Sequence, residues 1–348
     1  MRLAVAGLAL ALALAGASAH AQQRPAWAIA IHGGTGGSAR GGLSPQSEAA
    51  HRAALARSLK IGTDILSRGG TSLDAVEAVV RDLEDEPLFN AGKGAVFNAD
   101  GAVELDAAVM DGATLGAGAV AGVSRTRNPI SLARRVMKTS GHVLLMGEGA
   151  DRFSKAEGLE QVDNSYFYTE HQWRSLERAL AQRGLPVPPR PASLAKSRAA
   201  LEDGLAADHE FGTVGVVALD SHGDLAAGTS TGGMVGKRWG RVGDSPIIGA
   251  GTYASNQSCA VSGTGKGEVF IRLTLAREVC ALVQHKGLSL QSAADELIGR
   301  VKALGGGGGL IAVAPNGDIA WSYNTPSLFR AKAVAGQPPV VAIFPDEP

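Results

Sequence analysis

The sequence is poor in cysteine and in aromatic residues, and its charges balance. Its 348 residues include 33 basic and 33 acidic side chains, so the formal net charge is zero. A balanced chain offers no basic surface that would attract nucleic acid or an anionic membrane. The two cysteines, Cys259 and Cys280, have a spacing that fits no zinc motif. We expect two buried free thiols, although export would permit a disulfide between them.

Aromatic residues make up only 5% of the chain, whereas glycine occurs 47 times. This imbalance indicates many tight turns and close backbone packing. No periodic glycine repeat or low-complexity segment is present, which excludes fibrous and disordered classes. The length suits one large domain or two ordinary ones.

Long apolar runs are missing except at the N-terminus. Arg2 precedes an Ala/Leu stretch from Leu3 to Leu14, and small-x-small motifs end at Ala19 and Ala21. This stretch falls short of the ~20 apolar residues that a membrane anchor needs. The pattern therefore predicts a signal peptide over residues 1–21, export to the periplasm or beyond, and a mature chain that begins near Gln22.

Hydroxyl residues gather around a predicted β-hairpin in the second half of the chain. The pair Gly212–Thr213 precedes a β-branched run, Val214 to Val217, that is typical of a strand. A second predicted strand ends at Thr231, and Asp220 to Asp224 forms the turn between the two. The hairpin would place Thr213 and Thr231 side by side at its open end.

A threonine hydroxyl is a weak nucleophile and needs a base beside it. Cleavage of the Gly212–Thr213 bond would free an α-amino group on Thr213, whose pKa of roughly 7.7–8.0 suits proton transfer near neutral pH. We therefore predict that Thr213 is a nucleophile released by cleavage at this bond, with Thr231 donating to or orienting its Oγ1. The alternative is that Thr213 is an ordinary strand threonine.

Two charged residues follow in the sequence RVGDSP. The planar guanidinium of Arg241 matches a carboxylate in two-pronged fashion, and the carboxylate of Asp244 can accept from an ammonium group. Together they suit the α-carboxylate and α-amino groups of an aspartyl unit. The alternative is a salt bridge between Arg241 and Asp244 that fixes a loop.

These residues belong to a longer series of motifs. AIHGGTGG, EDEPLFNAGKGAVF, ELDAAVMDG, RVGDSP, VSGTGKGEVFIR and LGGGGGLIAVAPNGDIA occur in this order. With them the chain resembles the plant-type asparaginases, which are also isoaspartyl peptidases. The resemblance covers nearly everything after the leader except the region around 155–210.

The resemblance implies an N-terminal nucleophile (Ntn) hydrolase that cuts itself in two. The expected fold is α+β, a four-layer αββα sandwich of two facing, mainly antiparallel sheets. Residues 22–212 would form the α chain, with a flexible linker at about 184–211, and residues 213–348 would form the β chain. Both chains would share one domain and pair into an (αβ)2 dimer.

The resemblance also implies roles for single residues. Asn90 would support the nucleophile, the Thr264 hydroxyl and the Gly265 N–H would hold an oxyanion, and Gly265 would also contact the substrate. The glycines from Gly263 to Gly267 could alternatively cradle a phosphate, but the spacing of a dinucleotide motif is not met.

Catalysis would need no cofactor, and zinc is not implied. A structural sodium ion would be bound by backbone carbonyls, with the Lys93 side chain turned away, and its predicted ligands are Leu83, Glu84, Glu86, Phe89, Ala91 and Lys93.

The implied reaction is hydrolysis of β-aspartyl dipeptides and L-asparagine to release L-aspartate. Glycosylasparaginase is the alternative within enzymes, but Glu-Phe-Gly precedes Thr213 here, where that branch has His-Asp before its threonine. An exported amino-acid-binding protein that uses Arg241 and Asp244 without chemistry is the alternative outside enzymes.

Periodicity and turn residues predict the remaining elements. His32, at the end of the first strand, is predicted to be a hydrogen-bonded imidazole rather than a base. The polar stretch 153–210 is predicted to be a linker that contains one helix. The predicted helices span 44–69, 71–83, 129–137, 172–182, 268–284 and 289–303, and the predicted strands include 27–31, 103–110, 117–123, 143–146, 258–262, 310–314, 319–323 and 340–344.

Overall fold

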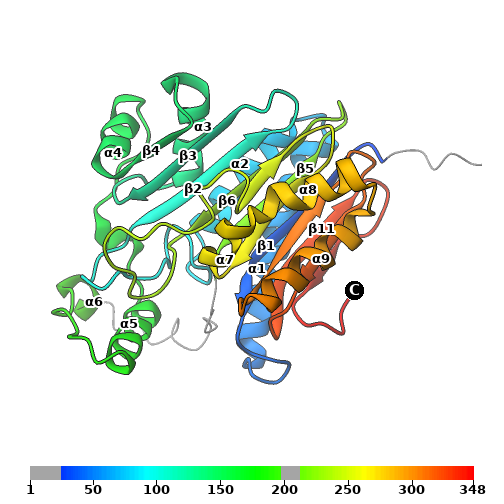
Figure 1. The fold of residues 1–348 in the computed structure, drawn as a ribbon. Coiled ribbons are helices and arrows are strands. Elements are labelled where there is room, and N and C mark those ends of the chain that lie inside the picture. Colours follow the sequence, from blue (N-terminus) through cyan, green and yellow to red (C-terminus); the bar gives the residue numbers. More distant parts are fainter. Residues whose placement is uncertain (1–24, 197–211) are drawn as a thin grey trace, which may run out of the picture.

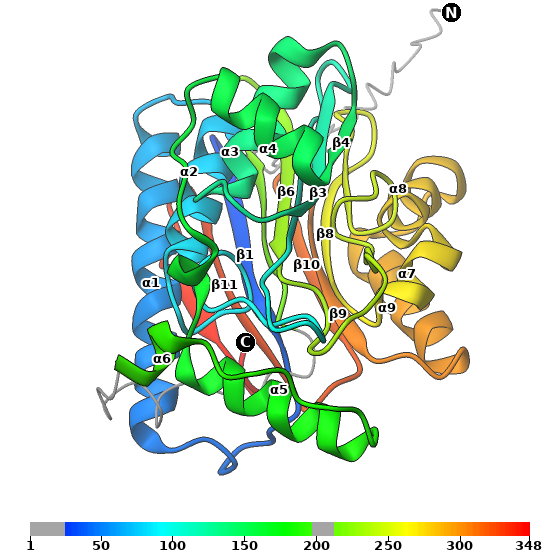
Figure 2. The same cartoon turned by 90° about the vertical axis from the view of Figure 1, so that its left-hand side faces the viewer.

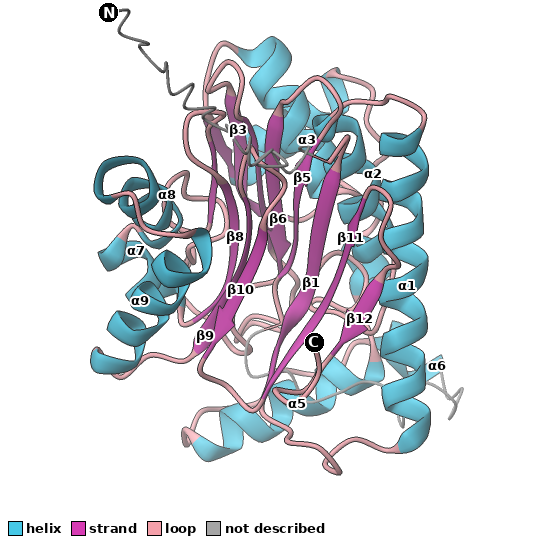
Figure 3. Ribbon diagram, turned by 90° about the vertical axis from the view of Figure 1, so that its right-hand side faces the viewer, coloured by secondary structure: helices cyan, strands magenta, loops and turns pink. Residues whose placement is uncertain are grey.

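The fold has four layers: helices, a large sheet, a small sheet, and helices again (Figures 1 and 2). The computed structural model describes residues 25–196 and 212–348. Helices α1, α2 and α3 contact the large sheet, whereas α8 and α9 contact the small one. Figure 3 shows the strands enclosed between these two helical layers. The predicted α+β class and αββα sandwich are confirmed.

The large sheet has eight strands and the small sheet has four. All neighbouring strands pair antiparallel except β3 and β4, which are parallel. In the large sheet the order is β12 (Val340–Ala342), β11 (Ser327–Val334), β1 (Ala28–Gly36), β5 (Val214–Leu219), β6 (Leu225–Thr231), β2 (Leu105–Asp111), β3 (Ala117–Val123) and β4 (Leu144–Met146). In the small sheet the order is β10 (Ile319–Tyr323), β9 (Gly308–Val313), β8 (Ala260–Gly265) and β7 (Thr252–Ala254).

The helices follow the chain as α1 (Pro45–Ser67), α2 (Ser72–Glu84), α3 (Pro129–Arg135), α4 (Gly147–Ala156), α5 (Glu170–Gln182), α6 (Ala192–Lys196), α7 (Gly267–Leu273), α8 (Leu275–Lys286) and α9 (Leu290–Ala303). A π-helical turn, Val136–Ser140, extends α3, and a 3-10 turn, Asn164–Phe167, precedes α5. Within the described residues, no helix has the length and apolar character needed to cross a membrane.

Three apolar clusters hold the layers together. One lies between the large sheet and its helices, one between the small sheet and its helices, and a third between the two sheets. The third is rich in alanine, including Ala30 and Ala227. Small side chains let the sheets approach closely, which brings residues of β1, β5, β6 and β8 within reach of one another.

Capping residues set the predicted helix starts. Ser44 accepts a hydrogen bond from the Ser47 N–H at 3.1 Å, and Pro45 occupies the first helical position. Thr71 caps α2 in the same way, through the Asp74 N–H. Asn128 precedes Pro129 at the start of α3, where the sequence also predicts a cap, but its side chain makes no capping bond.

The predicted helix 268–284 is two helices. Thr274 has a left-handed backbone with φ of 45°, and it separates α7 from α8. The first N–H groups of α8 find tertiary partners, since Ala276 donates to the Ala250 carbonyl at 3.0 Å and Arg277 donates to the Gly249 carbonyl at 2.9 Å. These bonds compensate the break, which local periodicity could not indicate.

The polar stretch predicted as a linker is folded in its first part. Its predicted helix is confirmed as α5, but Phe167 and Trp173 are fully buried, and the Trp173 ring lies 5.2 Å from that of Phe97. The linker prediction is therefore wrong for residues 153–171, which are folded ahead of the predicted helix. A few well-spaced apolar side chains are enough to anchor a polar segment.

The predicted flexible linker at about 184–211 is described only as far as residue 196. This part includes α6, where Leu194 is buried. Residues 197–211 and the predicted signal peptide, residues 1–21, lie outside the described residues.

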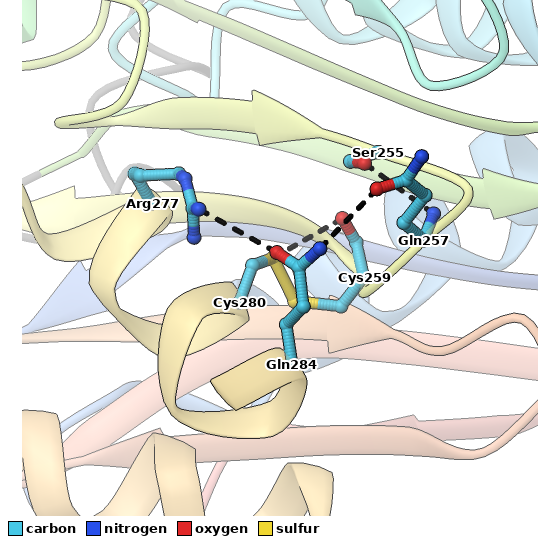
Figure 4. Close-up of a disulfide and its surroundings, with 6 residues drawn as sticks. All are labelled: Ser255, Gln257, Cys259, Arg277, Cys280 and Gln284. Atoms are coloured by element: carbon cyan, nitrogen blue, oxygen red, sulfur yellow. Dashed lines mark hydrogen bonds between the residues drawn. A yellow bond between two sulfur atoms is a disulfide. The ribbon is translucent and has the colours of Figure 1, made fainter. Parts of the chain in front are cut away.

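The predicted free thiols are wrong, because Cys259 and Cys280 form a disulfide (Figure 4). Their Cα atoms lie 5.3 Å apart, within the range that a disulfide spans. Cys259 immediately precedes β8 and Cys280 lies on α8, and these elements pack together. The bond fixes α8 to the small sheet, and both cysteines are fully buried.

We expect the double substitution Cys259→Ala and Cys280→Ala to lower the free energy of unfolding. The two cysteines are 21 residues apart, and closing a loop of that size contributes about 3 kcal/mol in the chain-entropy account. Urea unfolding without reductant measures the difference. Adding reductant should destabilise the wild type and leave the double variant unchanged. Titration of two free thiols in denatured, unreduced wild type would contradict the disulfide.

Candidate active site

The open end of the β5–β6 hairpin brings the two predicted threonines together. Val214 pairs with Ser230, so the next position on each strand places Thr213 opposite Thr231. Their hydroxyl oxygens lie 3.1 Å apart, and both residues are buried. The Thr231 oxygen also accepts from the Gly233 N–H at 3.0 Å, which fixes its direction. The predicted proximity is confirmed, and the catalytic roles of both residues stay predictions.

Asn90 contacts the predicted cleavage site through its backbone rather than its side chain. Its N–H donates to the Gly212 carbonyl at 3.2 Å, and its carbonyl accepts from the Gly232 N–H. Its side-chain amide donates to the Gly233 carbonyl at 2.8 Å and accepts from the Val96 N–H at 2.9 Å. These four bonds hold Asn90 rigidly beside the carbonyl carbon that a nucleophile at Thr213 would attack.

His32, on β1, supports the residue that follows the cleavage site. Its Nδ1 lies 2.9 Å from the Thr213 carbonyl oxygen, and its Nε2 lies 2.9 Å from Ser262 Oγ. Because a carbonyl only accepts, Nδ1 carries the proton and Nε2 accepts from Ser262. Burial lowers the pKa of His32 to about 3, so the ring is neutral. The prediction of a hydrogen-bonded imidazole is confirmed, although β1 continues past it to Gly36.

A chain of hydroxyls continues from His32 across both sheets. Ser262 Oγ lies 2.7 Å from Thr229 Oγ1, which lies 2.6 Å from Thr252 Oγ1. The four residues come from β1, β8, β6 and β7, so this hydrogen-bond network joins the two sheets next to Thr213. Gly215 makes room for it, since a Cβ there would lie 1.9 Å from Ser262 Oγ. This network was not predicted from the sequence, where polar residues inside apolar strands are the signal for it.

The predicted oxyanion residues lie on β8, next to this network. Ser262 points toward the large sheet, and Thr264, two residues further on, points the same way by strand alternation. Thr264 is fully buried. Gly263 and Gly265 are paired strand residues and form no turn, so the alternative of a phosphate cradle is wrong. The oxyanion role of Thr264 and Gly265 stays a prediction.

Arg241 and Asp244 converge on the same small space without forming an ion pair with each other. Arg241 instead pairs through Nε and Nη2 with the two carboxylate oxygens of Glu268, at 3.0 and 3.2 Å. A Cβ on Gly267 would lie 2.7 Å from Arg241 Nη2 and 3.0 Å from Asp244 Oδ1, so both charged groups meet over this glycine. The alternative of an Arg241–Asp244 salt bridge is wrong, and the role of Glu268 was missed.

Asp244 is buried, and within the described part of the chain its Oδ2 has no hydrogen-bond partner. Burial raises the pKa of Asp244 to about 7. A buried carboxylate with an unused oxygen gains from an incoming ammonium group, which supplies both charge and donors. On the other side, Arg241 Nη1 lies near Gly233, whose N–H contacts Thr231. The charged groups therefore flank the threonine pair.

Asp106, on β2, is a further buried carboxylate that the sequence analysis missed. It stands opposite Thr231 in the register of β2 and β6. Its Oδ1 accepts from the Gly122 N–H at 2.8 Å, whereas its Oδ2 has no partner among the described residues. Burial raises the pKa of Asp106, and the nearby Lys237 ammonium lowers it. Lys237 is itself buried and donates to the Glu104 carbonyl at 2.9 Å.

The predicted sodium loop follows α2. Three of its carbonyls already accept backbone N–H groups, because Glu86 donates to Leu83, Lys93 to Glu84 and Phe89 to Glu86. Each carbonyl keeps a second lone pair. A Cβ on Gly94 would lie 2.5 Å from the Pro87 carbonyl oxygen and 2.9 Å from that of Phe89. The loop thus turns carbonyl oxygens inward around a glycine, which fits an oxygen-bound cation.

The Glu84 side chain turns away from this loop. It accepts from the Ile130 N–H at 3.0 Å and from Ser230 Oγ at 2.6 Å, and burial raises its pKa to about 8. The carbonyl, rather than the carboxylate, is therefore the group that Glu84 offers to a cation. The described residues contain no cluster of three or more His, Cys, Asp or Glu side chains that could hold a metal.

Comparison with known proteins agrees with this geometry. The chain is 48% identical over 317 residues to the isoaspartyl peptidase of Escherichia coli (strain K12), covering 91% of this chain and 95% of that protein. It is 43% identical over 314 residues to the probable isoaspartyl peptidase/L-asparaginase 2 of Arabidopsis thaliana, covering 88% and 95%. It is 39% identical over 310 residues to the isoaspartyl peptidase/L-asparaginase of Homo sapiens, covering 89% and 94%.

A family model described as asparaginase matches residues 25–343, which is nearly the whole length of the chain. With the αββα fold and the threonine pair in place, the chain belongs to the asparaginase family that this model describes.

Proposed function

We propose that the chain cleaves its own Gly212–Thr213 bond and then uses Thr213 to hydrolyse β-aspartyl dipeptides and L-asparagine, releasing L-aspartate. The observation that carries this proposal is the 3.1 Å contact between the Thr213 and Thr231 hydroxyls, beside a carbonyl of Gly212 that Asn90 already hydrogen-bonds. The names of the relatives, isoaspartyl peptidase and L-asparaginase, favour this reaction over that of a glycosylasparaginase.

Self-cleavage begins when Thr213 Oγ1 attacks the Gly212 carbonyl carbon. The carbonyl oxygen gains negative charge, which the Asn90 N–H stabilises by donation. The C–N bond then breaks, the amide nitrogen takes the proton that Oγ1 has given up and becomes the α-amino group, and Gly212 is left as an ester on Oγ1. Water hydrolyses that ester and frees both chain ends. Thr231 holds Oγ1 in the direction of attack.

Hydrolysis of substrate uses the same oxygen with a new base. The α-amino group of Thr213 removes the hydroxyl proton as Oγ1 attacks the β-carbonyl carbon of the aspartyl unit. Arg241 binds the α-carboxylate, Asp244 binds the α-ammonium group, and Thr264 with the Gly265 N–H donates to the oxyanion. Ammonia or an amino acid leaves with the proton. Water then hydrolyses the β-aspartyl ester on Oγ1 and releases L-aspartate.

Export and assembly are further parts of the proposal. A signal peptide over residues 1–21 would direct the chain to the periplasm or beyond, where the Cys259–Cys280 disulfide is stable. N-terminal sequencing of exported protein then gives an α chain that begins near Gln22.

We also propose an (αβ)2 dimer, which sedimentation equilibrium tests directly; a single αβ unit at micromolar concentration would argue against it.

Thr213→Ala should abolish both steps. It removes the oxygen that attacks, so we expect one intact chain on a denaturing gel. The rate of hydrolysis should fall by a factor on the order of 10⁴ or more. Thr213→Ser keeps the oxygen and should still cleave and hydrolyse. An amino-acid-binding protein without chemistry would instead remain one chain in the wild type and bind aspartate equally well after Thr213→Ala.

The pH dependence should separate Asp244 from the α-amino base. Asp244 must be ionised to attract an ammonium group, and its pKa of about 7 means that this attraction is lost as pH falls through that value. The bound ammonium lowers the pKa of Asp244, so the effect belongs to free enzyme only. On the acid side we expect kcat/KM to depend on two protonations, those of Asp244 and of the α-amino group. We expect kcat to depend on one, that of the α-amino group.

Asp244→Asn is the control for this profile. It should lower kcat/KM by about 100-fold, since a charge-assisted bond is lost, and leave equal acid-side slopes for kcat and kcat/KM. Equal slopes in the wild type would contradict the assignment of Asp244 as the ammonium site.

We also propose that the loop after α2 binds a structural sodium ion through the carbonyls of Leu83, Glu84, Glu86, Phe89, Ala91 and Lys93. A cation that binds only the folded state raises the midpoint of thermal unfolding. The midpoint should therefore be higher in sodium chloride than in choline chloride at equal ionic strength. Identical midpoints over a wide range of salt concentration would speak against the site.

A further inference from the structure

A strained and exposed tryptophan stands just before Arg241. Trp239 has φ of 58° and the following Gly240 has φ of 69°. The Arg241 N–H donates to the Arg238 carbonyl at 3.1 Å and closes the turn. Positive φ at both central positions defines a type I′ turn, which Gly, Asn and Asp adopt readily and bulky residues do not. Such an outlier calls for a functional explanation.

Nothing within the described residues compensates this strain by burial. Trp239 is 90% exposed, the largest exposure of any large hydrophobic residue in that part of the chain. Its ring contacts the Arg238 guanidinium, which lies 4.2 Å from the ring centroid. Among the described residues Arg238 pairs with no acidic side chain. The turn therefore presents a flat apolar ring and an unpaired cation to solvent, as one stacked unit.

The position of this unit relates it to the proposed substrate. Arg241 Nη1 lies near Gly233, and the Gly233 N–H contacts Thr231, so the turn leads directly into the site. Asp244 is buried, whereas Arg238 and Trp239 are exposed. The site therefore has a buried inside at Asp244 and a solvent-facing outside at the turn. An aspartyl unit held by Arg241 and Asp244 fills the inside. The residue attached to its β-carbonyl must extend outward.

We propose that Arg238 and Trp239 form the binding subsite for the leaving amino acid. The inference rests on the proposed function and names its preferred substrates. The Arg238 guanidinium would pair with the α-carboxylate of the leaving residue, and the indole of Trp239 would pack against its side chain. The preferred substrates are then β-aspartyl dipeptides with a large apolar or aromatic second residue. L-Asparagine, which has no second residue, gains nothing from the subsite.

The chain offers a matched control for the effect of strain. Leu115 also has φ of 58° and is 55% exposed. It lies in the turn between β2 and β3, beyond Asp111, whereas Asp106 at the other end of β2 is the residue opposite Thr231. Leu115→Asn therefore relieves the same backbone strain at the end of the sheet away from the site.

The experiment measures kcat/KM for L-asparagine, β-aspartyl-glycine, β-aspartyl-leucine and β-aspartyl-phenylalanine with the cleaved enzyme. The variants are Trp239→Asn, which suits a left-handed backbone, Arg238→Gln and Leu115→Asn. We expect Trp239→Asn to lower the ratio of kcat/KM for β-aspartyl-phenylalanine to kcat/KM for L-asparagine about tenfold. Arg238→Gln should lower the ratio of every dipeptide to L-asparagine, by about threefold. Leu115→Asn should leave all ratios unchanged.

Several outcomes would overturn the subsite. One is an equal loss on all four substrates in Trp239→Asn, with a shift to smaller particles in sedimentation, which would assign Trp239 to a subunit contact. Unchanged ratios of kcat/KM in both Trp239→Asn and Arg238→Gln would show that neither side chain contacts the leaving amino acid. A wild type that cleaves itself but hydrolyses none of the four substrates would refute the proposed function instead, and the subsite with it.

Discussion

The antiparallel pairing of β5 with β6 is the constraint on which the rest of the site depends. Once Val214 faces Ser230, Thr213 must face Thr231, and the two hydroxyl oxygens lie 3.1 Å apart. The peptide bond before Thr213 then sits at the end of a rigid sheet, where Asn90 reaches its carbonyl and His32 reaches the next one. A nucleophile on a strand end is held more precisely than one on a loop. In the proposed self-cleavage, the hairpin would thus position both the bond that breaks and the oxygen that attacks it.

Buried charge is the second organising feature, and it is left incomplete. Asp244 and Asp106 each keep one oxygen without a partner in the described structure, and burial raises the pKa of both. Arg241 is already paired on one edge by Glu268. Desolvated charges are costly unless they are matched. In the proposed reaction the α-ammonium group of the substrate would supply the opposite charge that Asp244 lacks, and this interaction would contribute to substrate binding.

Local signals in the sequence were enough to predict much of this structure. Ser44 and Thr71 cap the helices that they were expected to begin, and the turn from Asp220 to Asp224 fixes the hairpin. Family resemblance supplied the sandwich itself. What local signals could not supply are contacts made across the fold. The Cys259–Cys280 bond and the break at Thr274 depend on where α8 meets the small sheet.

Other features were hidden by residue type. β11 was not predicted, because Arg330 and Lys332 interrupt its apolar pattern, although Arg330 is buried and donates to the Phe344 carbonyl. Glu268 looked like an ordinary acidic residue in the first turn of a helix, and only the fold places it against Arg241.

The central claim is that one residue supplies both the attacking oxygen and, after cleavage, the base. The most direct measurement is N-terminal sequencing with intact mass of freshly purified, active protein. The account predicts two chains, the second beginning TVGVVALD, whose masses add to that of the precursor without its signal peptide plus one water. A single uncleaved chain that hydrolyses β-aspartyl dipeptides at the full rate would contradict it.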